Sequence, residues 1–280
     1  MKKCLVIVNT HKEASLAMEK IISAYLLEHG IKTDSFYFDG FSEEDCFEGY
    51  DFVITLGGDG TVLFAARNCV QSDIPVFPVN FGEFGFIASV QKEDWQKEID
   101  KFLSGKAEFD ERSMLNAALI SKDRRFFSGI GLNDVVISAK TVARTILFDV
   151  SYNDVSLGTF KADGIIISTA TGSTAYSASA GGPIIDPDLD ALVLTPVNSF
   201  SLSSRPLVLS PKGEIGITML SSREKNAIIT IDGQRPFELE TGDIIKIRRL
   251  SKKVRLIGCN AKKFYGALRS KLNWSGGPHA

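Results

Sequence analysis

The sequence lacks the features that mark proteins held together by zinc or disulfides and proteins that span membranes. It has only four cysteines and three histidines in 280 residues, without a Cys-x-x-Cys pair or a zinc-ligand spacing. Scattered thiols are typical of buried small residues in a reducing compartment. The apolar run at residues 4–8 is too short for a signal-peptide core or a membrane span. We therefore expect a cytoplasmic protein that does not bind a membrane.

An excess of charge of one sign is also missing. The chain has 32 basic and 34 acidic residues and a formal net charge of −2. Nucleic-acid-binding domains usually carry a strongly basic face, so nucleic acid is not an expected partner. Hydrophobic residues make up 44% and charged residues 24%, which is typical of a globular protein with one large or two ordinary domains.

The first hundred residues alternate between strand-like and helix-like segments. Strands are expected at 4–8, 33–38, 52–56 and 74–79, and helices at 13–28, 62–70 and 93–103. Gly30 predicts the end of the first helix. Alternation of this kind favours a parallel sheet flanked by helices.

From about residue 113 the chain consists of short β-branched runs separated by turn residues. Such a series predicts an all-β domain, either a sandwich or an open barrel. The expected strands are 115–120, 135–138, 145–152, 165–168, 191–196, 206–209, 214–219, 227–231, 244–248 and 254–257. A hairpin turn rich in basic residues is expected between the last two. We expect an α/β domain at 1–110, an all-β domain at 111–260, and a C-terminal helix at 261–280 that packs on the first domain.

Three glycines surround one carboxylate in the segment Thr55-Leu56-Gly57-Gly58-Asp59-Gly60-Thr61, between an expected strand and an expected helix. Glycines let backbone N–H groups approach phosphate oxygens at such a turn. A carboxylate there suits a Mg²⁺ ligand or a group that accepts a proton from an attacking hydroxyl. A tight turn in which Asp59 caps the helix is the alternative. The spacing matches neither a Walker loop nor a Rossmann dinucleotide fingerprint.

Small and hydroxylated residues dominate the segment from Thr169 to Gly182, which follows an apolar strand. It could be a flexible loop. A packed pocket wall fits better, because the run lies between apolar strands and Tyr176 is its only aromatic residue. Tyr176 is expected to stack near a ligand ring or to fill the interdomain core.

The chain resembles the NAD kinase family in motifs that occur in this order: Gly57-Gly58-Asp59-Gly60-Thr61, Asn133-Asp134-Val135-Val136, Asp163-Gly164, Thr171-Gly172-Ser173-Thr174-Ala175-Tyr176 and Gly181-Gly182-Pro183. The likeness extends to Asn80-x-Gly82-x-x-Gly85-Phe86 and Ser270-Lys271-Leu272-x-Trp274. The glycine-aspartate turn alone also occurs in diacylglycerol and sphingosine kinases, whereas the Thr-Gly-Ser-Thr-Ala-Tyr block is far more specific.

The resemblance implies a Rossmann-like α/β domain, a C-terminal β-sandwich domain, and NAD bound between them in a homo-oligomer, a dimer or tetramer. It implies transfer of a phosphoryl group from ATP to the adenosine 2′-hydroxyl of NAD, giving NADP. Mg²⁺ or another divalent metal is expected at the donor phosphates, held through them or by Asp59, without a site fixed by the protein alone.

The resemblance also assigns residues. Asp59 matches the catalytic aspartate, which we expect to act as general base. The turn that holds the donor phosphates comprises Gly57, Gly58, Gly60 and Thr61. The NAD-binding positions are Asp59, Gly60, Phe86, Asn133, Asp134, Arg144, Lys161, Asp163, Thr174, Ala175, Tyr176, Ser179 and Gln234.

This chain departs from the family at two of these positions. Asp134 stands where glutamate is usual, so its carboxylate reaches about one methylene less far. Lys161 stands where arginine is common, which keeps the charge but removes bidentate phosphate geometry.

Two other functions use the same residues. A lipid kinase would place the glycine turn beside a membrane-borne alcohol. It requires an apolar or basic face that binds the membrane interface, which the sequence does not clearly show. A non-catalytic NAD(P) sensor would keep the pocket without needing a carboxylate at position 59.

Overall fold

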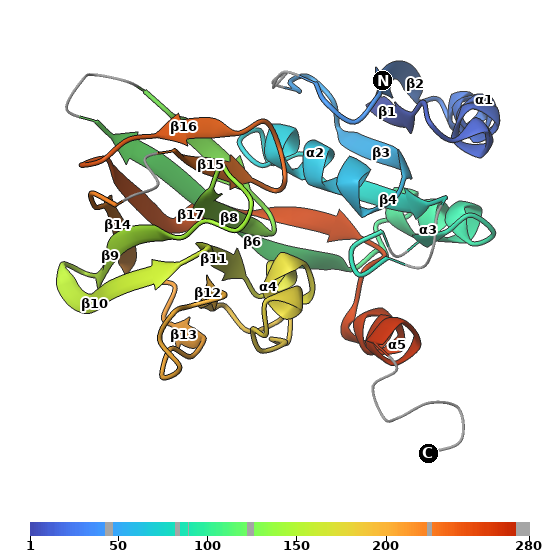
Figure 1. Cartoon of the computed structure of the whole chain (residues 1–280). Coiled ribbons are helices and arrows are strands. Elements are labelled where there is room, and N and C mark those ends of the chain that lie inside the picture. Colours follow the sequence, from blue (N-terminus) through green and yellow to red (C-terminus); the bar gives the residue numbers. More distant parts are fainter. Residues whose placement is uncertain (43–46, 82–84, 89, 122–125, 223–225, 273–280) are drawn as a thin grey trace. The chain divides into compact units, whose positions relative to one another are not determined.

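The structure is a computed structural model that describes residues 1–42, 47–81, 85–88, 90–121, 126–222 and 226–272. The chain divides into two compact units, and most of their elements are labelled in Figure 1. The first comprises Met1–Arg112 and Lys252–Ala280, and the second comprises Ser113–Ser251. The expected combination of an α/β part and an antiparallel β part is confirmed.

A parallel sheet forms the centre of the first unit, with strand order β2-β1-β3-β4. Its strands are β1 (Lys3–Asn9), β2 (Lys32–Phe38), β3 (Phe52–Gly57) and β4 (Val76–Asn80), and the short β5 (Val90–Gln91) pairs with β4. The helices are α1 (Glu13–Glu28), α2 (Asp59–Cys69), α3 (Trp95–Leu103) and α5 (Ala261–Leu272). Helix α1 ends where the sequence predicts, because Gly30 adopts a φ of 73° and donates its N–H to the Leu27 carbonyl.

Helices cover both faces of this sheet. Ile22 of α1 and Trp95 of α3 lie in one apolar cluster with Val6 of β1. Phe64 of α2 stacks instead on Phe36 of β2, with ring centroids 5.4 Å apart. Phe36 pairs with the residue after Val6 and therefore points to the opposite face. Burial on both faces explains why β1, β3 and β4 are continuous apolar runs.

Two sheets form the second unit. One has the order β13-β12-β11-β8-β15-β16, and the other contains β10, β9, β14, the first part of β17, and β6 paired with β7. The strands of the first sheet are β8 (Asp134–Ala139), β11 (Gly164–Thr169), β12 (Leu192–Val197), β13 (Leu207–Leu209), β15 (Ala227–Ile231) and β16 (Phe237–Leu239). Those of the second are β6 (Phe109–Ile120), β7 (Ser128–Gly131), β9 (Ile146–Tyr152), β10 (Val155–Ala162), β14 (Glu214–Met219) and β17 (Ile244–Ile257).

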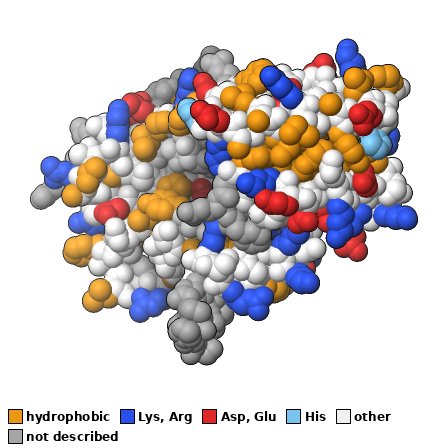
Figure 2. Space-filling model, turned by 90° about the vertical axis from the view of Figure 1, so that its right-hand side faces the viewer, with side chains coloured by type: hydrophobic (Ala, Val, Ile, Leu, Met, Phe, Trp, Pro, Cys, Tyr) orange, Lys and Arg blue, Asp and Glu red, His pale blue; other side chains and the backbone are white. Residues whose placement is uncertain are grey.

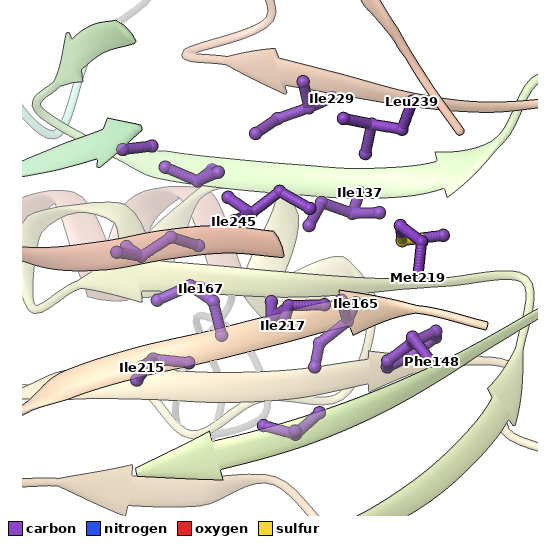
Figure 3. Close-up of a cluster of buried hydrophobic side chains, with 14 of the residues drawn as sticks. Ile137, Phe148, Ile165, Ile167, Ile215, Ile217, Met219, Ile229, Leu239 and Ile245 are labelled. Carbon is purple, nitrogen blue, oxygen red and sulfur yellow. The ribbon is translucent and has the colours of Figure 1, made fainter. Parts of the chain in front are cut away.

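The side chains of both sheets meet in one apolar core, part of which is drawn in Figure 3. Ile137 and Ile165 come from the six-stranded sheet, and Phe148 and Ile217 come from the other. All four side chains are fully buried. This arrangement is the sandwich that the alternating short strands predict.

The prediction of a hairpin turn after residue 248 is wrong, because Ile244–Ile257 is one strand, β17. Its first part pairs with β14 in the second unit, and Leu256 pairs with Val76 in the first. Pairing near both ends keeps the backbone extended, while exposed basic side chains in the middle give the sequence the polarity of a turn. The strands β5, β7, β10 and β16 were not predicted.

Figure 2 shows Lys and Arg side chains interspersed with Asp and Glu side chains over the face that it draws. Among the residues that the structure describes, no helix is long and apolar enough to cross a membrane.

Candidate functional site

The glycine-aspartate turn joins β3 to α2, with Gly58 at the N-cap and Asp59 as the first helical residue. Asp59 does not cap the helix. Its Oδ2 accepts the N–H of Phe86 at 3.1 Å, and its Oδ1 accepts the N–H groups of Ala88 at 2.8 Å and Ile87 at 3.3 Å. The carboxylate is therefore held across the turn by a second backbone segment.

This second segment approaches Asp59 very closely. A Cβ atom added to Gly85 would lie 2.0 Å from Asp59 Oδ1, so a side chain at position 85 would displace the carboxylate. A carboxylate has about four acceptor directions, and three of those of Asp59 are occupied. Gly82, which belongs to the same sequence motif, lies outside the described residues.

The four residues expected to hold donor phosphates differ in their surroundings. Thr61 is only 1% exposed, and its Oγ1 accepts a hydrogen bond from Asn9 Nδ2 at 3.3 Å. A Cβ on Gly57 would lie 2.2 Å from that Oγ1. These contacts give Gly57 and Thr61 a packing role, whereas Gly60 is exposed with open space around its Cα.

A cationic side chain that the sequence analysis did not select lies beside this turn. Lys12 Nζ is 3.8 Å from the position of a Cβ on Gly58 and donates to the Phe81 carbonyl at 3.2 Å. Lys12 follows the carboxyl end of β1, the edge at which α/β sheets bind ligands. That position was the signal available in the sequence.

Phe86 lies next to α5. Its ring centroid is 5.9 Å from that of Phe264, and Lys271 Nζ lies 5.7 Å from the Phe86 ring centroid. Lys271 belongs to the closing motif of the sequence, whose Trp274 lies outside the described residues.

In the second unit, the backbone of Asn133 and Asp134 is held by the end of β11. The Asn133 carbonyl accepts the N–H of Thr169 at 2.9 Å, and Thr169 Oγ1 donates to the Leu132 carbonyl at 2.6 Å. Thr169 Oγ1 in turn accepts the N–H of Gly172 at 3.0 Å. A Cβ on Gly172 would lie 2.0 Å from the Asn133 carbonyl oxygen, so only glycine fits there.

Asp134 begins β8 and is 5% exposed. Burial, with a smaller contribution from the nearby carboxylate of Asp232, raises the pKa of Asp134 to about 7. The carboxyl group therefore titrates near neutrality and can serve as hydrogen-bond donor or acceptor.

The hydroxyl-rich segment is helical rather than a flexible loop. Thr171–Thr174 form a 3-10 turn and Tyr176–Ser179 a short α-helix, α4. Ser177 is fully buried, and its Oγ lies 2.9 Å from Thr195 Oγ1. Tyr176 is 49% exposed and so does not fill the core of this unit. Thr174 and Ala175 are half-buried and Ser179 is exposed.

The remaining expected residues fall into two groups at opposite ends of β11. Gln234 follows β15 near the Asn133 end, and its N–H donates to the Ile231 carbonyl at 2.9 Å. Asp163 precedes β11 and accepts a hydrogen bond from Asn198 Nδ2 at 3.0 Å. Lys161 Nζ lies 4.7 Å from the ring centroid of Phe200. The length of β11 separates the two ends by roughly 17 Å.

Arg144 belongs to the Asp163 end. It is exposed and lies two residues before Ile146, which pairs with Ala162. Asn198 and Phe200, which contact Asp163 and Lys161, were not selected from the sequence, because they lie in a turn after β12 without a recognisable motif.

The described residues do not fit a divalent metal held by the protein alone. They contain no group of three or more His, Cys, Asp or Glu residues placed to hold an ion. Asp59 has three of its acceptor directions occupied by backbone N–H groups.

Comparisons with known proteins agree on one family. Residues 9–107 match the ATP-NAD kinase N-terminal domain, and residues 132–259 match the ATP-NAD kinase C-terminal domain. The chain is 46% identical to the NAD kinase of Treponema denticola over 277 residues, which cover 99% of this chain and 98% of that protein.

Two solved structures share the fold. Yeast NADH kinase complexed with NADH has a TM-score of 0.86 at 22% identity, covering 98% of this chain and 88% of that one. An NAD kinase from Archaeoglobus fulgidus in complex with ATP has a TM-score of 0.78 at 24% identity, covering 96% and 99%. With both parts matched and a relative this similar over its whole length, the chain belongs to the NAD kinase family.

Proposed function

We propose that this enzyme transfers the terminal phosphoryl group of ATP to the adenosine 2′-hydroxyl of NAD, forming NADP. The observation that carries the proposal is the 46% identity to an NAD kinase over 99% of the chain. Structural relatives that contain NADH and ATP support the choice of substrates.

Asp59 is the proposed general base. A secondary alcohol is a poor nucleophile until a base accepts its proton, and a carboxylate within hydrogen-bond reach can do so. The backbone N–H groups of residues 86–88 fix the carboxylate, and the described residues leave about one of its acceptor directions free. In the proposed complex the 2′-hydroxyl of NAD takes this direction.

The donor phosphates are proposed to bind at the N-terminus of α2. Free backbone N–H groups and the helix dipole favour anions there, and Gly58 and Gly60 leave the approach open. Lys12 supplies a positive charge beside Gly58. A divalent cation that accompanies ATP would be carried by the donor's own phosphates, because the described residues do not form a metal site.

NAD is proposed to contact the group around Asn133, Asp134 and Tyr176. Asp163 and Lys161 lie at the other end of β11. They are too far from the group around Asn133 to contact the same part of one small ligand. In the expected homo-oligomer they complete the site of a second copy of the chain.

The proposal is tested by incubating the purified chain with ATP, Mg²⁺, and either NAD or diacylglycerol. We expect NADP as the product, with the new phosphate identified as a 2′-monoester by ³¹P NMR, and no phosphorylated lipid. Phosphorylation of diacylglycerol alone would contradict the proposal. So would NAD binding without any NADP formation.

A further inference from the structure

Asp232, at the end of β15, holds the backbone that carries Asn133 and Asp134. Its Oδ2 accepts the N–H of Leu132 at 2.9 Å. Its Oδ1 accepts the N–H groups of Asn133 at 2.8 Å and Asp134 at 3.2 Å. The N–H of Asp232 itself donates to the Asp134 carbonyl at 3.0 Å. One aspartate thus binds three consecutive residues that lie about a hundred positions earlier in the chain.

The position of Asp232 has two energetic costs, one from burial of its carboxyl group and one from its backbone conformation. Asp232 is 8% exposed and lies near the buried carboxyl of Asp134, and burying two carboxyl groups together is unfavourable. It also has a φ of 48°, in the left-handed region that aspartate and asparagine adopt more readily than other side chains. The three donated N–H groups offset these costs by stabilising the carboxylate in one position.

The segment that Asp232 holds presents an unused polar atom. Asn133 Oδ1 is buried and has no hydrogen-bond partner among the described residues. The Asn133 carbonyl is already engaged by the N–H of Thr169, so the backbone is fixed from two sides. A small shift of this backbone would move the Asn133 amide and the Asp134 carboxyl together.

We propose that Asp232 is a positioning residue for NAD: it fixes the backbone at residues 132–134 so that Asn133 and Asp134 face the ribose hydroxyls and adenosine of the substrate. This inference rests on the proposed function. It assigns to Asp232 a role in binding NAD, while the binding of ATP is left to the glycine turn of the first unit.

The test is the variant Asp232→Asn, which keeps the size of the side chain and suits the left-handed backbone. Its amide has one oxygen acceptor and places an NH₂ group against backbone donors. We expect the KM for NAD to rise about 10-fold or more, with the KM for ATP changed less than about twofold. Amide hydrogen exchange at residues 132–134 should become faster.

Asp243→Asn is the matched control. Asp243 is a 3% exposed aspartate of the same unit, and its Oδ2 accepts the N–H of Glu240 at 2.8 Å in the turn before β17. Its loss should lower the melting temperature but leave the KM for NAD within about twofold of the wild type. If a general loss of stability caused the rise in the KM for NAD, both variants would show the same rise.

An unchanged KM for NAD in Asp232→Asn, together with faster exchange at residues 132–134, would overturn the inference. If Asp232→Asn does not fold, Asp232→Glu keeps the charge but displaces its oxygens, and the same selective rise in the KM for NAD is expected. An unchanged KM in that variant would overturn the inference equally. Failure of the proposed function is recognised separately, because the wild-type chain would then form no NADP.

Discussion

Asp134 and Asp232 place two carboxyl groups in one buried region of the second unit, and only one of them is held by hydrogen bonds from three backbone N–H groups. Asp232 has these donors, so the energetic cost of burial falls mainly on Asp134. The two carboxyl groups therefore differ: that of Asp232 is fixed by hydrogen bonds, and that of Asp134 titrates near neutral pH.

The raised pKa of Asp134 predicts a stability that depends on pH. In the unfolded chain the carboxyl group returns to its ordinary pKa of 3.8, whereas in the folded chain the pKa is about 7. Between these values the folded state binds a proton that the unfolded state has released. The contribution to stability is therefore complete below pH 4 and is lost as the pH rises to 7.

Asp134→Asn removes this titration. We expect the free energy of unfolding of the wild type, relative to the variant, to fall by up to about 4 kcal/mol between pH 4 and pH 7.5. Urea unfolding of both proteins across this pH range measures the difference in free energy of unfolding. The control is Asp188→Asn, a substitution at an exposed position. Parallel pH curves for the wild type and Asp134→Asn would contradict the assignment.

At the scale of elements, the contact between Gly172 and Asn133 ties the 3-10 turn to the start of β8. The Cβ of an alanine at position 172 would meet backbone atoms, which cannot rotate away. We expect Gly172→Ala to lower the free energy of unfolding by about 1–3 kcal/mol and to weaken NAD binding.

Gly266→Ala is the contrasting variant. Gly266 lies within α5 and has no atom within 4 Å of its Cβ position, so alanine should stabilise the chain by about 0.5–1 kcal/mol. Urea unfolding compares the two substitutions. Equal stability of Gly172→Ala and the wild type would show that this contact is not as close as described.

The strands β1, β3 and β4 were predicted well because burial on both faces makes each of them a continuous apolar run. The end of helix α1 was predicted because Gly30 supplies the positive φ at its C-terminus. β10 was missed because polar residues and Gly158, at an irregularity in its pairing with β9, interrupt its alternation. The turn before it, Asn153-Asp154, has positive φ at both residues, which is the geometry of a two-residue hairpin. The dipeptide Asn153-Asp154 was therefore the feature of the sequence that could have predicted the hairpin and β10.

For the whole molecule, the two-part architecture and the family follow from motifs spread along nearly the entire chain. Individual motifs selected Asp59, Asn133 and Asp134 as candidate site residues. They did not identify Lys12 or Asp232, whose roles depend on contacts between strands far apart in sequence. For Asp232 such contacts leave no local spacing in one sequence, so a structure is needed to find them, whereas Lys12 could have been suspected from its place after β1.

Catalysis by Asp59 is the central step of the proposed function, and a comparison of two proteins tests it directly. The turnover number and the dissociation constant for NAD are measured for the wild type and Asp59→Asn. We predict that turnover falls by about 10²–10⁴-fold while the dissociation constant for NAD changes only a few-fold. Near-normal turnover in Asp59→Asn would contradict a catalytic role of Asp59.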